Sequence, residues 1–133
     1  MIHYKIYQSK RTDSTNGKFY ARAVATETYD LDQLAEHMAS HNTPFSKGAI
    51  KGVLVDMVKC IKELVLDGKQ VKVDDLALFK VAIRSTPAST ASDWTVATNV
   101  GSLKLNARAT GDLRPSEFKS EAKLKEMDAY EVQ

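Results

Sequence analysis

The sequence has one cysteine, three prolines and no apolar run long enough to cross a membrane. A membrane-spanning helix needs about 20 predominantly apolar residues, and the N-terminal stretch MIHYKIYQSKR lacks the apolar core of a signal peptide. Cys60 alone cannot form a disulfide within the chain, and its position in a helical pattern predicts a small packing residue. We therefore expect a cytoplasmic protein that does not associate with membranes.

Motifs that carry catalysis or metal binding are also absent. The sequence has no glycine-rich phosphate loop, no local Ser/His/Asp set and no Cys/His ligand spacing. His37 and His41 are four residues apart, but HMASH lacks the glutamate of HExxH, so surface histidines are favoured over a metal pair. Asp74 and Asp75, taken as adjacent strand residues, would point to opposite faces. The sequence predicts no enzyme, metal, cofactor or small-molecule substrate.

The best-defined pattern in the chain is a long helix followed at once by strands. Apolar residues recur every three or four positions from Ile50 to Val65, which predicts an amphipathic helix. Ser46 suits the N-cap, and Asp67-Gly68 suits the end of the helix. After Gly68 the apolar period changes to two, which predicts strands from Val71 to Ile83.

The flanking segments give weaker patterns. A β-hairpin is predicted for residues 2–8 and 19–24, with Asn16-Gly17 in its turn. Further predicted elements are a short helix at 28–40, a returning strand at 101–108 and a closing helix that starts at Pro115 and continues over 116–129. The hairpin loop carries Lys10, Arg11 and Lys18, for which loop solubility is favoured over phosphate contact.

The order of helix, turn and strands supports a family resemblance. Phe45-Ser46 opens the helix, and residues 68–81 read GKQVKVDDLALFKV. This segment resembles the bacterial histone-like family, HU and integration host factor, whose frame is Gly-x-x-Val-x-Leu-x-x-Phe-Gly-x-Phe-x-Val. The resemblance covers residues 28–84 well and the rest loosely. Asp75 and Ala77 stand where the family has glycines, which together with the extended N-terminus suggests a divergent branch.

The resemblance implies an α+β fold with a helical base, a β-sheet saddle and a protruding β-arm, assembled as an intertwined homodimer. On this basis residues 1–133 form a single HU-like domain. Its parts are an N-terminal β-hairpin extension (1–26), the helical base (28–68), the sheet and arm (69–110) and a C-terminal helix (115–130). The apolar stripe from Ile50 to Val65 agrees with a dimer, because a lone monomer would expose it.

The resemblance also implies a nucleoid-associated protein that binds duplex DNA with little sequence preference. The net charge is only +2, but residues 69–110 hold six basic against three acidic residues, and residues 1–26 hold five against one. Lysine and arginine would displace counterions from phosphates. The candidate DNA-binding residues are Arg84, Lys80, Lys72, Lys104 and Arg108. Arg84 alone falls on a position that is commonly basic in the family; charge and strand placement suggest the others.

The segment 84–102 departs from the family in its chemistry. The family arm is basic and carries a proline wedge at its tip, whereas this segment is rich in Ser, Thr and Ala, with Arg84 as its only cation and Pro87 near its base. Trp94 is predicted as a packing residue in preference to a stacking one. Residues 85–102 are expected to be mobile. The alternative function is a dimeric scaffold that has lost DNA binding and engages a protein partner through the arm.

Overall fold

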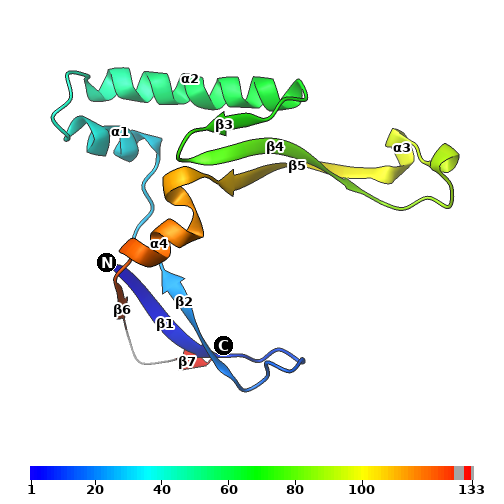
Figure 1. Cartoon of the computed structure of the whole chain (residues 1–133), viewed down its shortest axis with the longest axis horizontal. Helices are drawn as coiled ribbons and strands as arrows, with labels where there is room; N and C mark the ends of the chain where they lie inside the picture. The colour runs from blue at the N-terminus through cyan, green and yellow to red at the C-terminus, as the bar shows by residue number, and fades with distance from the viewer. Residues whose placement is uncertain (128–130, 133) are drawn as a thin grey trace. The chain divides into compact units, whose positions relative to one another are not determined.

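The computed structural model describes residues 1–127 and 131–132, and Figure 1 shows its elements in chain order. Contacts within the chain group it into two compact units. The first unit combines residues 1–30 with the segment from residue 118 onward, and the second covers Leu31–Glu117. In the part of the chain that the structure describes, no helix is long and apolar enough to cross a membrane. The single-domain organisation over 1–133 stays a prediction.

The first unit is a small sheet built around β1. Strands β1 (Ile2–Gln8) and β2 (Phe19–Val24) pair antiparallel, so the predicted hairpin is confirmed with its bounds. Two short strands, β6 (Leu124–Glu126) and β7 (Glu131–Val132), pair parallel with β1. Gly17 has a φ of +78°, the left-handed conformation expected of the Asn-Gly turn.

The closing helix is shorter than predicted. Helix α4 covers only Pro115–Glu121, and residues 124–126 form strand β6 instead. The backbone N–H of Ile2 donates to the Lys123 carbonyl at 2.8 Å, and that of Met127 donates to the Tyr4 carbonyl at 2.9 Å. Pairing with β1 thus satisfies backbone groups that a continued helix would have used. The last part of the predicted helix, residues 128–130, lies outside the described residues.

Two helices form the first half of the second unit. These are α1 (Leu31–Ala39) and α2 (Lys47–Leu66). Ser46 accepts a hydrogen bond from the Ala49 backbone N–H at 3.1 Å, which confirms it as the N-cap of α2. Gly68 follows α2 with a φ of +81°, as predicted for the helix end. Asp32 on α1 accepts from Lys47 at 3.0 Å and from Lys51 at 3.1 Å, which links the two helices.

A three-stranded antiparallel sheet forms the second half of this unit. Its order is β3 (Val71–Val73), β4 (Ala77–Ser85) and β5 (Val100–Ala109). Asp74 and Asp75 lie in the turn between β3 and β4, so the prediction that they are strand residues is wrong. Asp75 has a φ of +63°, and its carboxylate accepts from the Asp112 backbone N–H at 3.3 Å. A left-handed residue therefore occupies the position where the resembling family has glycine.

The segment between β4 and β5 is folded. It contains a 3₁₀ turn, η1 (Ala91–Asp93), and a short helix, α3 (Val96–Asn99); a second 3₁₀ turn, η2 (Gly111–Leu113), follows β5. Asn99 is only 5% exposed. Its amide donates to the carbonyls of Thr86 and Pro87 at 3.1 and 3.3 Å, while its side-chain oxygen accepts from the Thr95 backbone N–H at 3.0 Å. One polar side chain thus joins both ends of this segment, which we call the tip (residues 86–99).

The core of the described chain is small. Its buried hydrophobic residues are Ala35, Ile50, Val65 and Ala77, and no large side chain among the described residues is fully buried. On α2, Val53 and Val58 remain 69% and 53% exposed. Cys60 is exposed as well, so the expectation that it packs inside is wrong for the single chain. The single chain therefore leaves much of the apolar face of α2 open to solvent.

Candidate nucleic-acid interface

The two faces of the β3–β5 sheet differ in character. Successive residues of a strand face opposite sides, and cross-strand partners share a side. Phe79 pairs with Val71, Val81 with Leu105, and Ile83 with Leu103. One face of the sheet is therefore apolar, and its Phe79 and Val81 line a hollow together with residues of α2.

The opposite face carries all five candidate DNA-binding residues. Lys72 of β3 and Arg108 of β5 both pair with Leu78 of β4. The remaining three candidates follow the same alternation, because the pairs along the hairpin are Lys80↔Asn106, Ala82↔Lys104 and Arg84↔Ser102. All five side chains are exposed. We call this surface the cationic face (Lys72, Lys80, Arg84, Lys104 and Arg108).

No acidic residue interrupts the strands of the cationic face. The sequences of β3, β4 and β5, which are all described, contain no Asp or Glu. Asp74 and Asp75 lie in the turn before β4, and Asp93 lies in η1 of the tip. All the charged residues of these strands are therefore positive, and the acidic residues Asp74, Asp75 and Asp93 lie in the turns at their ends.

The structure adds Arg114 to this surface, a residue that the sequence interpretation missed. A hollow of about 630 Å³ on the cationic face is lined by Lys80, Asn106, Arg108 and Arg114, among others. The Arg114 Nε–H donates to the Gly111 carbonyl at 3.3 Å, which holds the guanidinium group near η2. The charge distribution along the sequence does not point to Arg114, because residues 111–133 hold six acidic against four basic residues.

Apolar hollows lie on the helices of the second unit. One, of about 430 Å³, is lined by Met57, Ile61 and Val65 of α2 and by Phe79 and Val81 of β4, among others. Another, of about 310 Å³, is lined by residues from the end of α1 to the first turns of α2: Met38, Phe45, Ala49, Ile50, Val53 and Leu54. These open hollows are apolar surface of the kind that protein interfaces cover.

His37 of α1 and His41, two residues after the helix ends, come together. The Nε2 atoms of His37 and His41 lie 3.1 Å apart. Among the residues that the structure describes, no three His, Cys, Asp or Glu side chains are arranged to hold a metal ion.

Helices and two small sheets, with a cationic face on one sheet, define an α+β protein. The model of the HU-HIG family, described as "HU domain fused to wHTH, Ig, or Glycine-rich motif", matches residues 1–125. The chain belongs to this family.

A solved structure supports the fold independently. The chain is similar to a crystal structure from Bacteroides vulgatus ATCC 8482 of a protein named as a candidate bacterial DNA-binding protein. The TM-score is 0.69 at 14% identity, over 99% of this chain and 49% of the other. The chain thus spans about half the length of that protein, and at this identity the similarity shows the fold alone. No curated protein matches the chain.

Proposed function

We propose that the chain is a nucleoid-associated architectural protein of the bacterial cytoplasm that binds duplex DNA with little sequence preference. The cationic face is the proposed contact surface. The observation that carries this proposal is the register of β3, β4 and β5, which brings five Lys and Arg residues to one side of one sheet. The family supports it, because HU-like domains are typically non-catalytic architectural proteins.

The chemistry of the face favours phosphate contacts over base recognition. Lys and Arg at strand positions can each approach a backbone phosphate and release condensed counterions. Such contacts position a protein on DNA but carry no sequence information. Asn106, which pairs with Lys80 and lies two residues before Arg108 on β5, adds a neutral hydrogen-bonding side chain to this surface. We therefore expect affinity that depends on salt much more than on sequence.

We further propose that the binding form is a homodimer. The buried apolar residues of the described chain are few, whereas α2 exposes Val53 and Val58 and borders two apolar hollows. A second copy that covers this surface would remove it from water, which is favourable by about 25 cal/mol per Å² of apolar area. A dimer would also double the number of cationic faces available to one duplex.

A second candidate function is a dimeric scaffold that engages a protein partner through the tip. The tip has no Lys or Arg, and it exposes Trp94 and Val96, the latter by 71%. A segment with one acidic residue, no cation and exposed aromatic and aliphatic side chains suits a protein contact better than a phosphate contact. The first function requires binding to duplex DNA, whereas the scaffold function does not.

The experiment that separates them is a gel-shift series on random duplex DNA at several salt concentrations. Each phosphate contact contributes about −0.9 to the slope of log K against log salt. With five candidate residues, some screened by neighbouring acids, we expect a slope on the order of −2 to −4. If the protein fails to shift random duplex at about 50 mM salt, where electrostatic binding is strong, the scaffold function replaces DNA binding.

A further inference from the structure

The sheet of the first unit has two unlike faces. Tyr7 of β1 pairs with Tyr20 of β2, and Lys5 pairs with Arg22, so these four side chains share one face. The residues of the other face are mostly apolar: Ile2, Tyr4, Ile6, Phe19, Ala21 and Ala23. The Lys and Arg side chains of β1 and β2 thus lie on the same side as Tyr7 and Tyr20, in a sheet that is separate from β3–β5.

The two tyrosines form an aromatic pair in which Tyr20 is exposed and Tyr7 is half-buried. Their ring centroids are 6.1 Å apart and the rings are tilted by 33°. The guanidinium carbon of Arg22 lies 5.5 Å from the centroid of Tyr7, within the range of a cation–π contact. Tyr20 is 40% exposed although it lies in a paired strand. An aromatic surface is therefore presented to solvent next to a positive charge.

The hairpin loop lies against this pair. A hollow of about 260 Å³ is lined by Tyr7, Ser9, Lys10, Arg11, Thr15 and Tyr20. Lys18 precedes Tyr20 by two positions, and Lys10 follows the buried Ser9; both lysines are exposed. The hollow therefore combines the rings of Tyr7 and Tyr20 with the hydroxyl groups of Ser9 and Thr15 and the basic side chains of Lys10 and Arg11.

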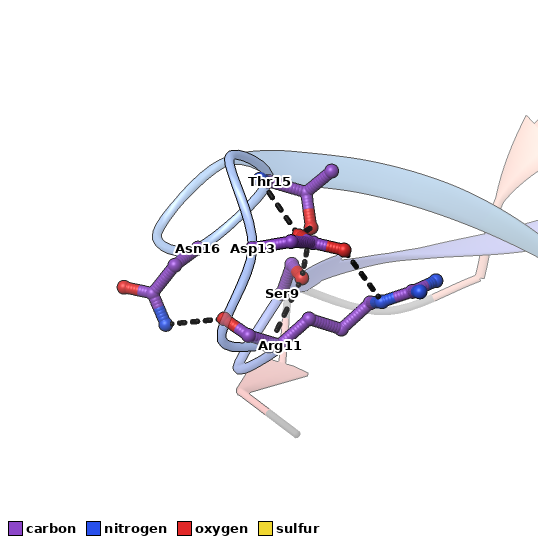
Figure 2. A network of polar contacts seen from close by, with 5 residues as sticks. All are labelled: Ser9, Arg11, Asp13, Thr15 and Asn16. Atoms are coloured by element: carbon purple, nitrogen blue, oxygen red, sulfur yellow. Dashed lines mark hydrogen bonds and ion pairs between the residues drawn. The ribbon is translucent and has the colours of Figure 1, made fainter.

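Internal hydrogen bonds give the loop a defined shape, as Figure 2 shows. The Asp13 carboxylate accepts from the Thr15 hydroxyl at 2.6 Å and from the Thr15 backbone N–H at 2.9 Å, and it pairs with Arg11 at 3.2 Å. These hydrogen bonds from Thr15 hold the pKa of Asp13 below its ordinary value. The Asn16 amide donates to the Arg11 carbonyl at 2.8 Å. These contacts give the backbone of the loop a defined form and fix Arg11 against Asp13.

We propose that this surface binds single-stranded nucleic acid. We call it the hairpin face, and its residues are Lys5, Tyr7, Lys10, Lys18, Tyr20 and Arg22. Unpaired bases stack on Tyr20 and Tyr7, and the flanking phosphates lie against Lys10 and Lys18. Stacking platforms beside basic grooves are the way in which proteins hold single strands without sequence preference. In a duplex the base faces are already stacked on one another, so an exposed tyrosine ring selects unpaired bases.

This site is independent of the cationic face. It uses residues of β1, β2 and their loop, and it requires neither duplex binding nor the homodimer. The first 26 residues hold five basic against one acidic residue, a charge complementary to a phosphate backbone. The two sites together would let one protein hold duplex and unpaired segments of the same nucleic acid.

The test uses the full chain and fluorescence anisotropy with a labelled dT oligomer. A matched abasic strand of the same length and charge serves as the second probe. Tyr20→Ala should weaken binding of the dT oligomer at least about fivefold and leave the abasic strand unchanged. Tyr20→Phe should bind normally, because stacking uses the ring and not the hydroxyl. Tyr29→Ala, which removes an exposed tyrosine outside the sheet, is the control.

Three results would overturn the inference. The first is no binding of the dT oligomer by the wild-type chain at low salt. The second is an equal loss of affinity for the dT and abasic strands in Tyr20→Ala, which would show that Tyr20 does not stack on bases. The third is unchanged dT binding in a Tyr20→Ala chain whose circular dichroism matches the wild type. Duplex binding is measured in parallel with Lys80→Ala plus Arg108→Ala, so a failure of the proposed duplex function is recognised separately.

Discussion

The side-chain amide of Asn99 donates to the main-chain carbonyl of Thr86 at 3.1 Å, across the two ends of the tip. A Ser/Thr/Ala-rich segment that was expected to be mobile is thereby given a specific hydrogen-bonded form. Losing this side chain would remove the hydrogen bonds to Thr86 and Pro87 and from the Thr95 backbone N–H that join the two ends of the tip.

Asn99→Ala should loosen the tip. We expect limited proteolysis within residues 86–98 to accelerate several-fold, since local opening exposes the backbone to the protease. The matched control is Asn106→Ala on β5, an exposed position outside this network. Equal cleavage rates in wild type and Asn99→Ala would show that the network does not hold the tip in solution.

Gly111→Ala should destabilise the second unit. A Cβ at Gly111 would lie 2.0 Å from the Asp75 carboxylate oxygen and 2.8 Å from its Cα, and the φ of +54° is itself unfavourable for alanine. We expect a loss of about 1–3 kcal/mol in the free energy of unfolding, measured by urea denaturation. Gly48→Ala, where nothing lies within 4 Å of the added Cβ, is the control. A Gly111→Ala protein as stable as Gly48→Ala would contradict the close approach of Asp75.

Val58→Asp should prevent association of the chains. A carboxylate buried without a partner costs several kcal/mol, and Val58 lines the apolar hollow beside α2. Sedimentation equilibrium at micromolar concentration should show a dimer for the wild type and a monomer or unfolded chain for the variant. Lys59→Asp puts the same side chain at the next position, outside the apolar stripe, and should remain dimeric. A folded, monodisperse wild-type monomer would exclude the homodimer.

Asp32 should make stability depend on pH in the acid range. Hydrogen bonds from Lys47 and Lys51 lower the pKa of Asp32 in the folded chain below its ordinary value of 3.8. Its contribution is therefore complete above the unfolded-state pKa and is lost as pH falls through the folded-state pKa. Asp32→Asn should lower the urea midpoint at neutral pH and have no effect at pH values below both pKa values. The control is Asp56→Asn, at an exposed acidic residue of α2, which should leave the urea midpoint unchanged both at neutral pH and in acid. A deficit in Asp32→Asn that persists in strong acid would contradict this linkage.

Arg84→Ala combined with Lys104→Ala should weaken all duplex sequences alike. Removing two phosphate contacts should flatten the slope of log K against log salt by about two units. Lys119→Ala with Lys123→Ala removes the same charge outside the cationic face and serves as the control. Equal slopes in the two double variants would mean that net charge alone, and not the cationic face, sets the affinity.

Local patterns were sufficient to predict most elements of this chain. Alternating apolar residues and an Asn-Gly turn predict the hairpin of β1 and β2. The capping residue Ser46 and the glycine at 68 predict the two ends of α2. The candidate site was predictable in part for the same reason. Alternation along β4 separates Lys80 and Arg84 from Phe79, Val81 and Ile83 before any pairing is known.

Only the tertiary structure decided which strands share a face and where distant segments meet. The cationic face depends on the register of β5 against β4, because a slip of one residue would turn Lys104 and Arg108 to the apolar side. Residues 124–126 became a strand because β1, more than a hundred residues earlier, offered free backbone groups to pair with. The sequence by itself determines which local conformations have the lowest free energy. Pairing between distant segments depends on partners that no local pattern contains.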